Sequence, residues 1–233
     1  VAHQWALGVE RYIEKWKKYN KKKDIYNYCK ETFELPNILK HLNVVLGNIR
    51  IDLGVGGAHQ SIQPGIYKEC DKYAIYDCDF QSYYPSLSIE NFLAPKHYDP
   101  QVWVDTYGGM KEARLQFNKK THPNENKALK LSLNSTYGNS GNKFSPIRDP
   151  AYTVSTCING QLGIIMLCEI LQSIDGLQIV STNTDGVLSF VPKSKEDEYF
   201  NKCEKFSEVT KLILEFERYE KLLHRDVNNY LYK

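Results

Sequence analysis

The stretch YDCDFQSYYPS, from Tyr76 to Ser86, combines an apolar strand with acidic residues near its end and sets the fold of the chain. The residues Tyr73–Asp79 predict a buried strand, and Pro85 is expected in the turn that follows. Asp77 and Asp79 lie two residues apart, so their side chains point to the same face of the pleat. Asp77 is therefore a possible further acidic group beside Asp79.

A second acidic segment is STNTDG, from Ser181 to Gly186. Strands over Leu177–Thr182 and Val187–Val191 predict a tight hairpin that carries Asp185 at its tip. If neighbouring strands carry them, Asp79 and Asp185 converge. Each aspartate alone would more often be a turn or capping residue. Two converging carboxylates, however, can hold a pair of divalent ions about 3.5–4 Å apart for phosphoryl transfer, and Mg²⁺ favours such oxygen ligands.

The third segment, KLSLNSTYG, predicts a helix with a polar face. Lys130, Asn134 and Tyr137 are spaced i, i+4, i+7 and share that face. A lysine there neutralises a triphosphate, Asn134 and Tyr137 line a pocket for base and sugar, and Gly138 lets a base pair approach the backbone. The alternative is an ordinary amphipathic helix whose leucines join the core.

Strands and helices alternate along the rest of the chain. We expect further helices over 1–24, Pro36–Val45, Ser86–Phe92, Val102–Lys120, Asn126–Asn139, Pro150–Ser173 and Lys193–Lys211. A strand is expected to run into a glycine-rich turn at Gly54, Gly56 and Gly57, and later strands to cover Leu212–Tyr219 and Val227–Tyr232. The fourth and fifth of these helices, joined by a polar turn, predict an αα-hairpin. This order indicates an α+β sheet domain with a helical insertion.

Bulk properties set only broad limits. The chain of 233 residues is long enough for one large core, with or without a small subdomain. The net charge of +2 does not indicate a nucleic-acid partner, and the lysine-rich stretch 15–23 is equally well a solvated helix face or a phosphate-binding patch. Six cysteines without a C-x-x-C pair indicate reduced, intracellular thiols. The apolar run Gly163–Leu171 is too short to span a membrane, so no membrane partner is expected.

In their order and residues, the three segments resemble motifs A, B and C of family B DNA polymerases, in particular the phage-like type. DFQSYYPS is similar to D-x-x-S-L-Y-P-S, and KLSLNSTYG matches K-x3-N-S-x-Y-G at every fixed position. The resemblance implies a polymerase palm, which is an antiparallel sheet backed by helices, with a short two-helix fingers insertion. It predicts an N-terminal helical or linker region over 1–53, palm over 54–98, fingers over 99–142, and palm again over 143–233.

The resemblance also assigns roles to single residues. Asp79 and Asp185 would be catalytic and would bind two Mg²⁺ ions, replaceable by Mn²⁺, with help from the Phe80 carbonyl. The nucleotide would contact Ser82, Tyr83, Tyr84, Arg114, Lys130, Asn134 and Tyr137, with the two residues after Gln81 offering backbone amides to the triphosphate and Tyr84 acting as a steric gate. DNA would contact Gly56, Gly57, Gly138, Thr184 and Tyr230. Asp77 is interpreted as structural.

Some family features are absent from the sequence. The usual Y-x-D-T-D-S pattern becomes STNTDG, so Asn183 stands where an aspartate is expected and one negative charge is missing. Asparagines replace the lysine of the K-x-Y element before Tyr230. No D-x-E exonuclease signature precedes the palm, and a thumb would begin where the sequence ends. We expect the palm–fingers portion of a larger phage-like polymerase; the alternative is a naturally small or split enzyme.

The sequence therefore predicts template-directed DNA synthesis with primer-template DNA and dNTPs as partners. Thumb and exonuclease regions, or separate subunits, would complete it, and the expected location is the cytoplasm of a phage-infected bacterium. The alternative is an inactive palm that binds nucleic acid or serves in assembly, which Asn183 favours. A primase-like or RNA-synthesising enzyme is disfavoured by Tyr84.

Overall fold

The computed structural model describes residues 42–47, 49–54, 57–61, 64–118 and 120–233. These residues divide into two compact units. The sheet unit contains the described residues up to Gln81 together with Gly160–Lys233, and the helical unit is Ser82–Asn159. The predicted helix over 1–24, the lysine-rich stretch and Gly56 lie outside the described residues. These two units are compact parts of the chain and do not test the predicted boundaries of palm and fingers, which stay predictions.

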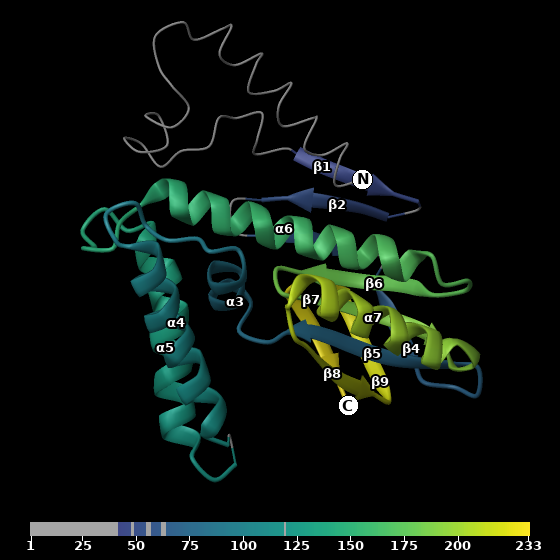
Figure 1. Cartoon of the computed structure of the whole chain (residues 1–233). Helices are drawn as coiled ribbons and strands as arrows, with labels where there is room; N and C mark the ends of the chain where they lie inside the picture. Colours follow the sequence, from purple (N-terminus) through teal and green to yellow (C-terminus); the bar gives the residue numbers. More distant parts are fainter. Residues whose placement is uncertain (1–41, 48, 55–56, 62–63, 119) are drawn as a thin grey trace, which may run out of the picture. The chain divides into compact units, whose positions relative to one another are not determined.

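The sheet unit is built on an antiparallel sheet of seven strands in the order β1-β2-β3-β6-β7-β5-β8 (Figure 1). Its strands are β1 (Leu42–Leu46), β2 (Ile49–Leu53), β3 (Ala58–Ser61), β5 (Tyr73–Phe80), β6 (Gln178–Asn183), β7 (Gly186–Pro192) and β8 (Leu214–Tyr219). A smaller sheet in the order β10-β9-β4 consists of β4 (Gly65–Lys68), β9 (Lys221–Asp226) and β10 (Asn229–Tyr232). The predicted α+β fold, with an antiparallel sheet backed by helices, is confirmed.

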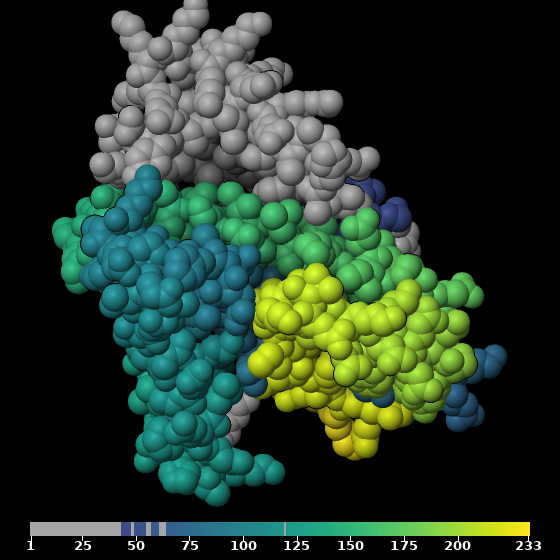
Figure 2. All heavy atoms as spheres, viewed as in Figure 1, coloured from purple at the N-terminus to yellow at the C-terminus, as the bar shows by residue number. Residues whose placement is uncertain are grey.

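Helices cover one face of the large sheet. The C-terminal part of α6 (Pro150–Gln172) and the helix α7 (Glu196–Thr210), which follows the 3₁₀ turn η2 (Lys193–Lys195), hide the central strands in Figure 2. Tyr76 of β5 stacks on Tyr199 of α7 with ring centroids 5.6 Å apart. Because strand side chains alternate, Ile75, Asp77 and Asp79 lie on the opposite face.

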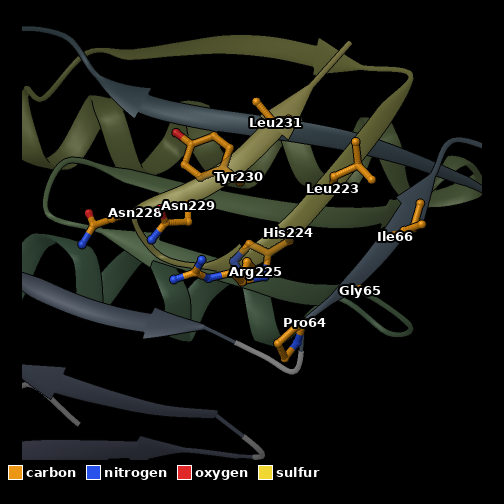
Figure 3. A pocket seen from close by; sticks show the side chains of 10 residues that line it. All are labelled: Pro64, Gly65, Ile66, Leu223, His224, Arg225, Asn228, Asn229, Tyr230 and Leu231. Carbon is orange, nitrogen blue, oxygen red and sulfur yellow. The ribbon is translucent and has the colours of Figure 1, made fainter.

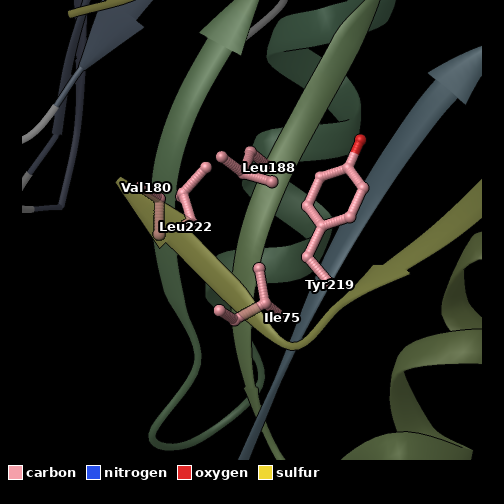
Figure 4. Packing of buried hydrophobic residues seen from close by; sticks show 5 residues of the cluster. All are labelled: Ile75, Val180, Leu188, Tyr219 and Leu222. Carbon is pink, nitrogen blue, oxygen red and sulfur yellow. The ribbon is translucent and has the colours of Figure 1, made fainter. Parts of the chain in front are cut away.

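That opposite face is apolar at one end and acidic at the other. Five buried residues from both sheets form its apolar cluster: Ile75, Val180, Leu188, Tyr219 and Leu222 (Figure 4). The small sheet therefore contributes to the core beside β5, and the acidic end of β5 begins where this cluster stops.

The helical unit contains α3 (Tyr83–Glu90), α4 (Pro100–Gln116), α5 (Pro123–Ser140) and the first turns of α6. α4 begins cleanly because the Asp99 carboxylate accepts a hydrogen bond from the Val102 amide at 3.0 Å and Pro100 occupies the first turn. The Tyr107 hydroxyl on α4 donates to the Leu133 carbonyl on α5 at 2.6 Å. This buried bond ties the predicted αα-hairpin together.

Two local predictions are wrong. The described end of the predicted helix Pro36–Val45 is strand β1, because pairing with β2 along five residue pairs outweighs the local preference. Pro85 lies inside the first turn of α3 rather than in a turn before it. A proline is accepted there because an amide in the first turn has no partner within the helix.

Helix α6 extends well beyond the apolar run noted in the sequence. By length and composition its 23 residues could cross a membrane, but one such helix is weak evidence for a membrane span. In the protein 56% of its most apolar window is buried, and Ile164, Ile165 and Leu171 are wholly inside the core. This side of the helix is therefore part of the protein core.

Candidate active site

The register of β5 and β7 brings the two predicted catalytic aspartates together. Asp79 pairs with Gly186, the residue after Asp185, and the Phe80 amide donates to the Asp185 carbonyl at 2.7 Å. Both aspartates line one cavity of about 120 Å³ in the sheet unit, together with Asp77, Ser181, Asn183, Gly186, Leu188, Val227 and Tyr230. We call this the acidic cavity. Neighbouring strand ends thus place two carboxylates beside one small space.

The tip of the β6–β7 hairpin is held by its backbone. Thr184 has a φ of 51°, a left-handed conformation that is uncommon for this residue type, and its amide donates to the Ala58 carbonyl at 3.1 Å. A Cβ atom at Gly57 would lie 2.7 Å from the Thr184 Oγ1, so only glycine leaves room for the threonine. The two predicted DNA contacts Gly57 and Thr184 therefore pack against each other and fix the tip that bears Asp185.

Gly186 makes room for the Asp79 carboxylate. A Cβ atom on Gly186 would lie 2.1 Å from the Asp79 Oδ1, a separation that real side chains do not reach. The carboxylate thus fills the space that any other residue at position 186 would use. Asp79 as a whole remains accessible to solvent while its carboxyl group lies against the β7 backbone.

Negative charge is concentrated on this part of the sheet. Across β5 and β8, Asp77 is opposite Glu217 and Asp79 is opposite Glu215, and like charges in facing positions destabilise a sheet. Burial, followed by the charges of Asp77, Asp185, Glu217 and Glu215, raises the pKa of Asp79 to about 7. Burial also raises the pKa of Asp77, against the effect of a hydrogen bond from Tyr219. A bound cation would relieve this repulsion.

This donor set fits a divalent metal that takes further ligands from elsewhere. Among the described residues, no three His, Cys, Asp or Glu side chains are placed to hold an ion by themselves. Asp79 and Asp185 would therefore share the ion with backbone, water or substrate oxygens, as Mg²⁺ commonly does. The role of the Phe80 carbonyl stays a prediction; its ring packs on Phe206 at 5.8 Å and anchors the end of β5.

The predicted phosphate-binding residues lie in the helical unit. Ser82 precedes α3 with a φ of 49°, and its hydroxyl accepts a hydrogen bond from the Arg114 Nη1. Arg114 is only 7% exposed, and its Nε finds no hydrogen-bond partner in the part of the chain that the structure describes. Since buried donors are normally satisfied, this guanidinium suits an anion.

Sequence reasoning missed a second buried cation, Lys111, three residues before Arg114 on α4. Burial lowers its pKa, while Glu90 and Glu112 act in the opposite direction. The signal was the i, i+3 spacing of two basic residues, which places both on one helix face. Lys111 is therefore a further candidate for phosphate binding.

The residues of α5 lie as their spacing predicts. Lys130 and Asn134 are exposed, and Tyr137 stacks on Tyr84 with ring centroids 4.0 Å apart and planes 7° from parallel. Tyr83 is buried, so any contact with a nucleotide is left to its backbone. At Gly138 an added Cβ atom would meet nothing within 4 Å. The helix thus presents a cation, an amide and an aromatic stack beside an open backbone.

Tyr230 lines the acidic cavity and also a groove on the small sheet (Figure 3). Burial and the charges of Asp77 and Asp79 raise its pKa, so its hydroxyl lies in the field of the carboxylates. Other residues of the groove include the exposed Arg225 and the asparagines Asn228 and Asn229. Tyr230 therefore belongs to both sites, and the Arg225 guanidinium in the groove is paired with Asp226 at 3.1 Å.

Comparison with known proteins supports the fold. The structure resembles the family B DNA polymerase from the hyperthermophilic archaeon Pyrobaculum calidifontis, with a TM-score of 0.54 and 16% sequence identity. The match covers 82% of this chain and 28% of the archaeal polymerase. No model of a protein family matches the sequence, and no curated protein matches it. The likeness confirms a family B polymerase fold and gives no support to the phage-like type, which stays a prediction.

Proposed function

We propose that the chain is the palm–fingers part of a template-directed DNA polymerase that adds dNTPs to a primer 3′-hydroxyl. The observation that carries this proposal is the convergence of Asp79 and Asp185 on one cavity, in a sheet with the family B polymerase fold. The N-T-D-G form of the third motif, from Asn183 to Gly186, favours the phage-like type, which would act in the cytoplasm of a bacterial host.

Each unit contributes its own groups to this chemistry. In the sheet unit, Asp79 and Asp185 would hold Mg²⁺ or Mn²⁺, with the Phe80 carbonyl as a further ligand. Two such ions, when bound, activate an attacking hydroxyl and stabilise the leaving pyrophosphate. In the helical unit, Arg114 and Lys130 would neutralise the triphosphate as charge-assisted donors. Primer-template DNA is the expected partner, and thumb and exonuclease regions or separate subunits would complete the enzyme.

Primer extension tests the proposal. The purified chain should extend a labelled primer on a template with dNTPs and Mg²⁺ or Mn²⁺, and Asp185→Asn should lower the rate by at least about 10³-fold, the order expected for losing a group that stabilises charge during the reaction. Asp71→Asn, an exposed position before β5 and outside the acidic cavity, is the matched control. Extension by Asp185→Asn at the rate of the control would refute the metal assignment.

The second candidate is a polymerase-like palm without activity that binds nucleic acid or serves in assembly. Asn183 is the observation that favours it, because this neutral side chain lines the acidic cavity where the family pattern has a carboxylate. A chain that binds primer-template DNA, takes up no metal in the cavity and extends no primer would establish this alternative.

Tyr84→Ala should weaken discrimination against ribonucleotides roughly 10- to 100-fold, the range that a change in pocket size produces. The stack on Tyr137 fixes the Tyr84 ring, so the ring can exclude a sugar bearing a 2′-hydroxyl. Incorporation of dCTP and CTP measures the effect, and Tyr84→Phe, which keeps the ring, should match the parent. Unchanged discrimination in Tyr84→Ala would remove the gate role.

A further inference from the structure

Asp77 faces the acidic cavity although it is not one of the two predicted metal-binding aspartates. It lines the cavity with Asp79, Asp185 and Asn183. The residue is half-buried, and its Oδ2 accepts a hydrogen bond from the Tyr219 hydroxyl at 2.9 Å. Its carboxylate is thus held in one orientation beside the pair.

Tyr219 connects this carboxylate to the protein core. Its ring is 5% exposed, belongs to the apolar cluster between the two sheets (Figure 4), and stacks on Tyr232 at 4.3 Å. Its hydroxyl also lies 3.3 Å from the Glu217 Oε2. A supporting group that is itself locked by packing holds a functional side chain in place, so the orientation of Asp77 rests on a rigid neighbour.

The strand register shows why Asp77 and Asn183 are comparable positions. One cross-strand row runs from Asn183 through Gly186 to Asp79. The next row on the same face of the sheet runs from Ser181 through Leu188 to Asp77. Asn183 therefore neighbours Asp79 across Gly186, which has no side chain. Asp77 neighbours Asp79 along β5. Of these two polar neighbours only Asp77 carries a charge.

We propose that Asp77, oriented by Tyr219, supplies the third negative charge of the metal site in place of a carboxylate at position 183. The inference rests on the proposed function, because that function requires a metal at Asp79 and Asp185. Asp77 is a positioning residue that acts through the field it shares with the two ligands. Its Oδ2 already accepts the hydrogen bond from the Tyr219 hydroxyl, so the proposal leaves direct contact with the ion to Asp79 and Asp185.

Titration of the full chain with Mn²⁺ alone, followed by electron paramagnetic resonance of the free ion at pH 8, tests this role. Asp77→Asn should weaken Mn²⁺ binding about 10-fold, the lower end of the effect of losing an outer-shell partner. The double variant Asp77→Asn with Asn183→Asp should recover most of that loss, because it returns one charge beside Asp79. Asp52→Asn, on β2 and outside the cavity, should bind like the parent.

Each outcome decides between distinct conclusions. If Asp79→Asn loses Mn²⁺ binding while Asp77→Asn does not, the inference is overturned and the proposed function stands. If Asp77→Asn loses Mn²⁺ binding and the double variant does not recover it, the inference is also overturned. The hydrogen bond between Asp77 and Tyr219 would then have a structural role only. Unchanged Mn²⁺ binding in Asp79→Asn removes the metal site and both proposals.

Tyr219→Phe provides a second test if Asp77→Asn does not fold. This variant frees the Asp77 carboxylate without removing its charge. Mn²⁺ binding by Tyr219→Phe at the level of the parent would overturn the inference.

Discussion

Asp79→Asn is expected to abolish primer extension and, at the same time, to make the metal-free protein more stable. The loss of extension should reach at least about 10³-fold, because the variant lacks one of the two carboxylates that would hold the metal ions. The gain in stability follows from the repulsion around Asp79, whose carboxylate lies near Asp77, Asp185, Glu215 and Glu217. A neutral amide of the same shape removes that repulsion.

The sign of the pH dependence follows from the raised pKa of Asp79. Its folded value of about 7 lies above its ordinary value of 3.8, so the folded protein binds this proton more tightly than the unfolded chain. The stabilisation is complete below about pH 3.8 and is lost as the pH rises through about 7. At pH 8 with a chelator, Asp79→Asn should therefore be more stable by ~1 kcal/mol after allowance for solvent screening, a rise in Tm of about 2–4 °C.

Thermal unfolding at pH 5 and pH 8, with chelator or with Mg²⁺, measures this effect. The advantage of Asp79→Asn should shrink at pH 5, and Mg²⁺ should raise the Tm of the parent at pH 8 but not that of the variant, because only the parent binds the ion. A lower Tm of Asp79→Asn at pH 8 in chelator would show that the acidic residues do not repel one another in the folded state.

Gly186→Ser is expected to lower primer extension about 10²-fold, although serine is the residue found there in the family pattern. The new Cβ would lie 2.1 Å from the Asp79 Oδ1, so the carboxylate must move by about an ångström, and a displacement of that size at a reacting centre costs about this much in rate. Mn²⁺ affinity should fall in parallel.

A glycine with free space around it provides the control for this substitution. Gly109 lies on the exposed side of α4, and an added Cβ would meet nothing within 4 Å. Gly109→Ala should leave extension unchanged and raise stability by roughly 0.5–1 kcal/mol, as alanine does within helices. Parental extension by Gly186→Ser would mean that Asp79 acts equally well from another rotamer.

The sequence predicted those elements whose signals are local. The apolar run ending at Asp79, the turn residues beside Asp185 and the helical spacing of Lys130 with Tyr137 each contain their own evidence, and the structure has the corresponding strand, hairpin and helix. Strands β4 and β9 were missed because their sequences, GIYK and KLLHRD, do not alternate between apolar and polar residues; their pairing in the small sheet defines them instead.

The candidate site was predictable in its residues but not in their relations. The interpretation of Asp77 as purely structural relied on the family pattern, whereas its place in the acidic cavity follows from strand register and from Tyr219. Lys111 escaped notice because burial of a lysine depends on how α4 packs in three dimensions. The i, i+3 spacing places Lys111 and Arg114 on one face of α4, but no local pattern shows that this face is buried.

The contact between Gly186 and the Asp79 carboxylate also bears on how this chain can change over generations. Two positions more than 100 residues apart in sequence compete for one volume. A mutation that adds a side chain at position 186 is therefore acceptable only if the carboxylate at position 79 can take another orientation. Any substitution that permits this reorientation must come before the mutation at position 186. Descendants of this protein would then retain the glycine because the Asp79 carboxylate already occupies the space that a side chain at position 186 needs.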